Sequence, residues 1–301
     1  MNTLKQKREL SRTAKQRIFF WCIITLPLLQ FCIFYIGVNL NSFLLAFRNY
    51  DYETGYSFAG FNNFKRVWYD WINNEIFGVM FANSFLTYVV TLFVGLTLAL
   101  LFSYFIYKKM PLSNMFRVML FMPNILSTLV MALLFKYFSE NAIPVLFGYS
   151  IGGLLSSTKT AMPTLLFFLV WTGFGTQVLM FVGAMNNISE SVVESAKLDG
   201  ISPIKEFLFI TVPLIWPTVV TFIIVGISVL FTNQLNLYSF YGRGTPFGVQ
   251  TVGYYLYKSA QGGTLPEYPY LAAMGLMLTF ITLPIVLLVK RLLERFGPRV
   301  A

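Results

Sequence analysis

Residues 194–200 read ESAKLDG, and the chain continues as ISPIKEFLFITVPLIWP over residues 201–217. They belong to a charged segment, residues 186–213, that is broken by glycine and proline and bounded on both sides by long apolar runs. A charged segment between two runs long enough to cross a bilayer must lie at the membrane surface, because unpaired charge is costly in hydrocarbon. Residues 186–213 are therefore predicted to form a cytoplasmic platform, the name used for them below.

The platform has the sequence signals of two short helices. Ser189 is placed to cap a helix that begins at Glu190, whose acid suits the first turn. Gly200 is placed to end that helix, because glycine adopts the left-handed closing conformation without strain. Ser202 followed by Pro203 predicts the start of a second helix. The two helices are expected to meet at an angle.

Each predicted platform helix has an apolar side. In the first helix, Val192, Val193 and Ala196 fall opposite Glu190, Glu194 and Lys197. The apolar residues of the second are Ile204, Phe207, Leu208 and Ile210. Such a helix pair is able to fill a groove on another protein, or it is an ordinary amphipathic connector between two spans. Periodicity alone leaves both interpretations open.

The composition places the whole chain in a membrane. Of its 301 residues, 56% are apolar and only 11% are charged, far from the roughly one quarter charged of a soluble domain. The two cysteines, Cys22 and Cys32, share one apolar run, which gives neither a disulfide framework nor a thiolate metal site. The chain has no histidine, which excludes a His-based triad and a zinc site of the usual kind. We expect no catalytic residues and no metal.

The net charge of +10 is distributed as a membrane topology requires. Lysine and arginine are in excess in the segments assigned to the cytoplasm, whereas the segments assigned outside are nearly balanced. This is positive-inside asymmetry rather than the footprint of a nucleic-acid-binding protein.

Six apolar runs are long enough to cross a bilayer, which predicts an all-α polytopic membrane protein with both ends in the cytoplasm. The predicted spans are approximately residues 18–47, 79–107, 114–138, 161–185, 214–231 and 268–289. A basic amino tail (1–17), a six-span domain (18–291) that includes the platform, and a carboxyl tail (292–301) complete the organisation. A cleaved signal peptide is the alternative for the first run, but that run is long and lacks a small-residue cleavage site.

The platform resembles the "EAA" signature of permease subunits of ATP-binding-cassette importers. The residues that carry the resemblance are Glu194, Ser195, Ala196, Asp199, Gly200, Phe207, Ile210, Pro213 and Pro217. Ser195 departs from the first alanine of the signature. The segment FAGFNNF at residues 58–64 is similar to a loop motif of sugar-importer permeases, and residues 117–123 look like the opening of the family's third span.

This resemblance implies the type I importer permease fold, with the platform as a coupling helix pair. It implies a multi-pass subunit of a prokaryotic cell membrane that forms half of a carbohydrate pathway. The expected partners are a second permease subunit, a dimer of ATP-binding subunits, an extracytoplasmic solute-binding protein and membrane lipid. We expect no nucleic acid. The chain has no phosphate-binding GxxxxGK[ST] motif, so ATP and Mg are expected in the partner subunits and this chain is expected not to be an enzyme.

Polar and aromatic residues in the spans flanking the platform suit a neutral sugar or oligosaccharide. The candidate pathway residues are Trp171, Gly173, Thr176, Gln177, Thr232, Asn233, Gln234 and Asn236. Several match positions lining the sugar site of maltose-type permeases, although Thr176 replaces a tyrosine and Gln234 an aromatic residue. The alternative for each is an ordinary interhelical hydrogen bond or interfacial anchor. A polyol phosphate, amino acid or osmolyte is the alternative solute, and a stand-alone channel or membrane enzyme the alternative function.

Overall fold

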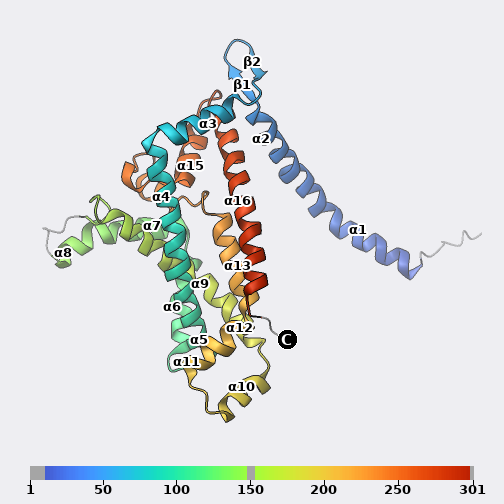
Figure 1. Cartoon of the computed structure of the whole chain (residues 1–301), viewed down its shortest axis with the longest axis vertical. Helices are drawn as coiled ribbons and strands as arrows, with labels where there is room; N and C mark the ends of the chain where they lie inside the picture. Colours follow the sequence, from blue (N-terminus) through green and yellow to red (C-terminus); the bar gives the residue numbers. More distant parts are fainter. Residues whose placement is uncertain (1–10, 148–152, 299–301) are drawn as a thin grey trace, which may run out of the picture.

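The computed structural model describes residues 11–147 and 153–298. The predicted amino tail up to residue 10 and the carboxyl tail from residue 299 lie outside these ranges. Figure 1 shows an upright bundle of helices with α10 at one end and a small hairpin at the other.

The first predicted span forms one continuous helical run. It consists of α1 (Arg12–Gln30), a π-helical segment (Phe31–Gly37) and α2 (Val38–Ala46). No residue of α1 is buried, and Figure 1 shows α1 leaning away from the bundle. Only α2 packs on the bundle, against α16 (Tyr268–Phe296).

The predicted ordered external segment after the first span is a hairpin followed by a helix. Strands β1 (Arg48–Asp51) and β2 (Gly55–Phe58) pair antiparallel with Arg48 opposite Phe58, and α3 (Asn62–Asn73) follows. The Asp51 carboxylate accepts the backbone N–H groups of Glu53 and Thr54 at 2.8 and 3.2 Å. These hydrogen bonds hold the pKa of the Asp51 carboxyl below its usual value, because they favour the charged form.

The second, fourth and sixth spans are confirmed as helices. The second consists of α4 (Glu75–Val90), a π-helical turn (Thr91–Gly95) and α5 (Leu96–Tyr107). The fourth is α9 (Ala161–Asn186). The sixth, α16, runs seven residues past the predicted end at residue 289. Its extension carries Lys290, Arg291 and Arg295 beyond the apolar run, where their charges reach water.

The predicted third span, residues 114–138, is wrong as a single helix. The chain forms α6 (Ser113–Ile125), then α7 (Thr128–Tyr137), a π-helical turn (Phe138–Ala142) and α8 (Ile143–Phe147). Leu126 and Ser127 are extended between α6 and α7, with ψ angles of 150° and 132°. Ser127 begins the new helix at the N-cap position that serine favours, and apolar composition alone gave no sign of this break. Figure 1 shows α7 and α8 running sideways from the upright α6.

The fifth span is bent where it leaves the platform. Its elements are α11 (Pro203–Glu206), a π-helical turn (Phe207–Thr211), α12 (Val212–Leu214) and α13 (Trp216–Ser228). The helical run Pro203–Leu214 makes an angle of 71° with α13. Pro217 lies in the first turn of α13, so the helix begins there without losing a hydrogen bond. The described residues contain five helices long and apolar enough to span a membrane, or six with this bent pair counted as one.

The external segment after α13 is folded rather than irregular. It contains α14 (Leu237–Tyr241), a 3₁₀ turn (Phe247–Val249) and α15 (Val252–Gly262). Phe240 and Tyr254 are almost fully buried there and share an apolar cluster with Phe168 of α9. Phe240 meets Phe168 edge to face at 5.0 Å.

The helix α9 is the centre of the bundle. It packs on α5, α6 and α13, and its buried residues include Phe174, Val178, Phe181 and Met185. The Ser103 hydroxyl of α5 has the Ala99 carbonyl of its own helix at 2.5 Å and the Val178 carbonyl of α9 at 3.2 Å, so its one proton is shared between the two acceptors. On the α6 side, the Thr176 hydroxyl donates to the Asn124 amide oxygen at 3.0 Å. A methyl group added at Gly175 would overlap the Leu120 carbonyl and the Asn124 amide.

Gly175→Ala is expected to destabilise the protein because a Cβ atom there forces α6 away from α9. The expected loss is about 1–3 kcal/mol, the range for overpacking, visible as a lower unfolding temperature in detergent. Gly173→Ala is the matched control, since nothing lies within 4 Å of a Cβ atom at Gly173. Equal unfolding temperatures for the two variants would contradict the close approach of α6 and α9.

Candidate functional site

The platform forms the two predicted helices. Helix α10 (Glu190–Leu198) follows Ser189, and α11 begins at Pro203. Gly200 has a φ of +68° in the turn between them. The N–H of Gly200 donates to the Lys197 carbonyl and that of Ile201 to the Ala196 carbonyl, both at 3.1 Å. This hydrogen-bond pair is the Schellman motif, which satisfies the last carbonyls of α10.

The second platform helix is fixed to the carboxyl-terminal end of α5. The Glu206 carboxylate forms an ion pair with the Lys108 ammonium, and the Glu206 side chain is only 7% exposed. The Tyr104 hydroxyl donates to the Pro203 carbonyl at 2.9 Å, and the Phe207 ring packs on Tyr104 at 4.9 Å. We call Tyr104, Lys108, Glu206 and Phe207 the clamp. The clamp joins residues about a hundred positions apart in the chain, so no local sequence pattern could indicate it.

The predicted coupling residues divide into two groups. Glu194, Ser195, Asp199 and Gly200 are exposed and free to meet a partner. Ala196 and Phe207 are buried within the chain, at 4% and 9% exposure. They hold the platform together, so any effect they have on a partner is indirect.

Several apolar side chains of the platform are exposed, and two of them flank the Gly200 turn. Leu198 is 88% exposed and Ile204 is 73% exposed, on either side of the Gly200 turn. Leu198 was missed because it lies four residues after Glu194, on the side of α10 that carries the charges. An isolated leucine on a polar helix face is the signal that would have found it. The end of the molecule formed by the platform therefore presents exposed apolar side chains as well as the exposed Glu194 carboxylate.

A charged cleft of about 350 Å³ separates α10 from the end of α5. Its lining residues are Tyr107, Lys108, Lys109, Glu190, Val193, Glu194 and Lys197. Both signs of charge line the cleft, which suits a partner surface that carries both signs. Among the described residues, no group of three or more His, Cys, Asp or Glu side chains is placed to hold a metal ion.

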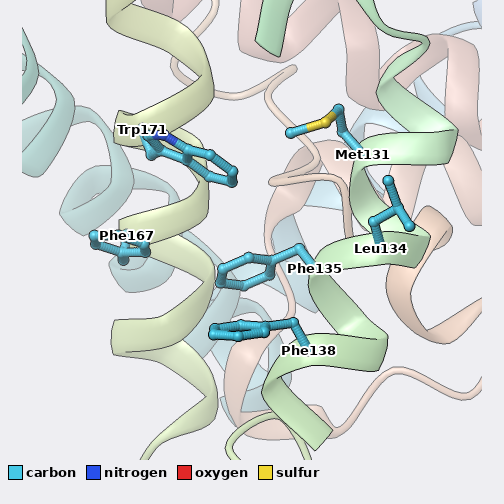
Figure 2. Close-up of a pocket in the computed structure, with 6 residues that line it drawn as sticks. All are labelled: Met131, Leu134, Phe135, Phe138, Phe167 and Trp171. Atoms are coloured by element: carbon cyan, nitrogen blue, oxygen red, sulfur yellow. The ribbon is translucent and has the colours of Figure 1, made fainter. Parts of the chain in front are cut away.

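Trp171 lies in an aromatic hollow of about 440 Å³ between α9 and α7. Figure 2 shows Trp171 and Phe167 on one helix, with the Trp171 ring pointing toward the other helix. The ring centroids of Phe135 and Phe167 lie 6.3 Å apart. The ring centroids of Phe135 and Trp171 lie 6.1 Å apart. The other lining residues are Met131, Leu134 and Phe138. The hollow offers ring faces and aliphatic side chains, and its polar partners would have to come from elsewhere.

The other candidate pathway residues of α9 have different surroundings. Thr176 is engaged with Asn124 of α6, and a Cβ atom at Gly173 would face open space. The side-chain oxygen of Gln177 is buried without a hydrogen-bond partner among the described residues. A buried amide oxygen without a partner is costly, so this atom is available to a donor from outside the chain.

The candidate residues after α13 form a compact turn. The Asn233 side-chain oxygen accepts the Leu235 N–H at 2.8 Å, and the backbone carbonyl of Asn233 accepts the Thr251 hydroxyl at 2.9 Å. Asn236 has a left-handed φ of 53° and begins α14. The side-chain oxygen of Gln234 is the second buried amide oxygen without a described partner.

The structure brings the two candidate segments near each other without closing one site around them. Leu235 shares an apolar cluster with Phe168, three residues from Trp171 on α9. Thr232 instead lines a separate hollow between α13 and α16. The polar pathway residues therefore stay a prediction, with Gln177 and Gln234 as the members whose unpaired oxygens favour a ligand.

Curated relatives of the chain are permease proteins of sugar transport systems. The arabinooligosaccharides transport system permease protein AraP of Bacillus subtilis is 28% identical, over 91% of this chain and 88% of that protein. The lactose transport system permease protein LacF of Rhizobium radiobacter is 26% identical over 74% of this chain and 77% of its own length. The multiple sugar-binding transport system permease protein MsmF of Streptococcus mutans is 22% identical over 90% of this chain and 93% of its own length.

The fold matches a chain in the crystal structure of a bacterial ABC transporter involved in the import of the acidic polysaccharide alginate. The TM-score is 0.80 at 18% identity, over 95% of this chain and 98% of that chain. A structure of bacterial alginate ABC transporter in complex with alginate pentasaccharide-bound periplasmic protein gives a TM-score of 0.76. These matches confirm the type I importer fold.

A family model also matches the chain over residues 91–301, which include the platform, α9 and every later span. The chain is thus a multi-pass membrane protein and a transport component rather than a catalytic subunit. It belongs to the family of inner membrane components of binding-protein-dependent transport systems.

Proposed function

We propose that this chain is one of two permease subunits of an ATP-driven importer of a neutral sugar or oligosaccharide, and that the platform couples it to the ATPase subunits. The observation that carries the proposal is an exposed helix pair, clamped to a span, in a chain of the binding-protein-dependent family. ATP and Mg bind in the ATPase dimer, and a solute-binding protein delivers the sugar from outside.

The platform is built to pass movement to several spans. A partner that grips Leu198, Ile204 and Glu194 pulls on α10 and α11. The clamp passes that movement to α5. On the other side of the bend, the Trp216 indole N–H donates to the Leu293 carbonyl at 3.2 Å, which ties the start of α13 to α16. A displacement of the platform therefore reaches α5, α13 and α16 together.

The surroundings of the pathway residues favour a neutral, polyhydroxylated solute. The hollow at Trp171 offers aromatic rings for the C–H face of a sugar, and the oxygens of Gln177 and Gln234 accept hydroxyl donors. The nearby Lys136 ammonium donates to the Phe240 carbonyl at 2.6 Å, which holds it against α14. The names of the sugar-transporting relatives support the same class of solute.

The solute class is tested by uptake in liposomes that contain the complete complex and its binding protein. Competition is measured with panels of neutral oligosaccharides, acidic oligosaccharides, polyol phosphates, amino acids and osmolytes. We expect neutral oligosaccharides to compete. Competition by amino acids alone, or by acidic sugars alone, would contradict the proposal.

Gly200→Asp is expected to lower the stimulation of ATPase activity by loaded binding protein several-fold, because the new side chain occupies the surface that the ATPase grips. The control is Gly55→Asp in the external hairpin, which has a similar φ of +73° and likewise nothing within 4 Å of its Cβ position. Both variants carry the same left-handed cost of about 1–2 kcal/mol, so a difference between them reports the partner. Full stimulation and full co-purification of the ATPase with Gly200→Asp would show that the platform is only a connector.

Glu206→Ala is expected to weaken coupling because it leaves the partly buried Lys108 charge without its partner, at a cost of about 1–3 kcal/mol. Part of the stimulation should return in the charge-swapped double variant Lys108→Glu, Glu206→Lys. The control is Glu294→Ala, which breaks an exposed pair with Lys290 at 3.8 Å that is worth about 0–1 kcal/mol. If Glu206→Ala left both the stimulation of ATPase activity and the unfolding temperature unchanged, the clamp would have no part in coupling.

A further inference from the structure

The two opposite faces of the external helix α3 have different surroundings, since one packs against the protein and the other is exposed. It follows the hairpin and precedes α4, and Figure 1 shows it lying across the end of the upright bundle. Asn63, Val67 and Asp70 point to one side at helical spacing, whereas Phe61, Lys65, Trp68 and Ile72 point to the other. The first set is buried or half-buried and the second set is exposed.

The inner face fixes the helix firmly to the ends of the first and sixth spans. The Asn63 side chain donates to the carbonyls of Ala46 and Arg48 at 3.0 and 2.8 Å. Val67 is completely buried. The Tyr270 hydroxyl of α16 donates to the Asp70 carboxylate at 2.7 Å, and the Arg66 guanidinium lies 4.8 Å from the centre of the Tyr270 ring. The direction of the outer face is therefore set by the fold.

The outer face carries a continuous row of large apolar side chains. Phe61 and Ile72 are each 65% exposed, Tyr69 is 64% exposed and Trp68 is 57% exposed. A row of this kind on a short helix whose other side is already packed against the protein indicates a binding surface, because water contact with it is unfavourable. Tryptophan and tyrosine are also the residues enriched where a bilayer meets water.

A hollow of about 500 Å³ lies beneath this row and reaches α16. It is lined by Phe61, Phe64, Lys65, Trp68, Tyr69, Ile72, Asn73 and Met277. Met277 lies seven residues after Tyr270, roughly 10 Å further along α16 toward the middle of the span. It is followed by the exposed Phe280 and Ile281. The hollow is thus followed along α16 by exposed apolar side chains of the span.

Lys65 supplies one positive charge at the edge of the hollow. Its side chain is exposed and forms no ion pair with a described carboxylate. A lysine in this position extends its aliphatic part over the apolar surface and holds its ammonium at the level of lipid phosphates.

We propose that α3 and the outer half of α16 form a docking site for a phospholipid of the extracytoplasmic leaflet. One acyl chain fills the hollow beside Met277, the phosphate pairs with Lys65, and the Trp68 and Tyr69 rings lie at the level of the headgroups. Because the inner face holds Ala46 and Tyr270, the lipid also anchors the outer ends of the first and sixth spans. The proposal does not depend on the solute that the complex transports.

The position of Trp68 is tested by fluorescence quenching with the assembled complex in nanodiscs that contain brominated phospholipids. Trp68→Phe is expected to remove a bromine-sensitive part of the emission, largest with bromine near the headgroup end of the acyl chain. Trp71→Phe is the control, because Trp71 packs inside the protein, edge to face on Phe81 at 5.2 Å. Equal losses from the two variants would overturn the proposal. Quenching of Trp68 in the isolated chain but not in the complex would also overturn it, since the surface would then belong to another subunit.

The role of Lys65 is tested by the rise in unfolding temperature that added lipid gives the complex in detergent. Phosphatidylglycerol is expected to raise it, and Lys65→Gln to reduce that rise at least by half. Lys258→Gln on the external helix α15 is the control and should keep the full rise. Inorganic phosphate at the same concentration is tested in parallel, to distinguish a site for a phospholipid from a site for any anion. An equal rise with phosphate, or an unchanged rise with Lys65→Gln, would refute the lipid site.

Discussion

The close packing of α9 against α5 and α6 is the interaction on which the rest of the structure depends. Lipid is as apolar as the helix surfaces, so helices in a bilayer gain little from hiding apolar side chains and rely on close contact and hydrogen bonds. Gly175 permits that contact with α6, and the Ser103 hydroxyl adds a hydrogen bond from α5 to the Val178 carbonyl. Because α9 leads directly into the platform at one end and packs on α14 at the other, its position fixes both functional regions.

The platform combines an exposed tip with a rigid base. At its base, Glu206 and Lys108 pair where the helices leave the membrane, and a buried pair holds geometry more firmly than an exposed one. At its tip, Leu198, Ile204 and Glu194 project from the chain. The Gly200 turn lies between the two exposed apolar residues and sets the angle of α10 to α11. The clamp holds this base to α5.

The exposed apolar surfaces of the chain have different origins. Helix α1 is exposed along its full length because it is a membrane span that only α2 joins to the bundle. The outer face of α3 is exposed on a helix whose other side is packed against the protein and held in place by hydrogen bonds. The hollow at Trp171 lies between two helices and is lined by aromatic rings from both. Exposure of apolar side chains is therefore not enough to distinguish a surface that contacts lipid from one that contacts a partner. The polar groups beside each surface have to be considered as well.

The sequence by itself determined the features that depend on local chemistry. Long apolar runs indicated most of the spans, and Ser189, Gly200 and Ser202–Pro203 indicated where the platform helices begin and end. The left-handed turn is specified by the glycine that occupies it, whereas the Ser189 and Ser202 side chains form no capping hydrogen bond. The motif at Glu194–Gly200 gave the family. The roles of the coupling and pathway residues stay predictions.

Only the tertiary structure decided the features that depend on distant neighbours. The break at Leu126–Ser127 was hidden because both halves of the predicted span are apolar, and a serine within such a run reads equally well as a helix residue or as a cap. Phe207 belonged to a signature expected to meet a partner, yet it packs inside the chain on Tyr104. The ion pair of Lys108 with Glu206 joins two separate spans. Periodicity shows which side of a helix is apolar, but the partner of that side is chosen by the packing of the whole chain.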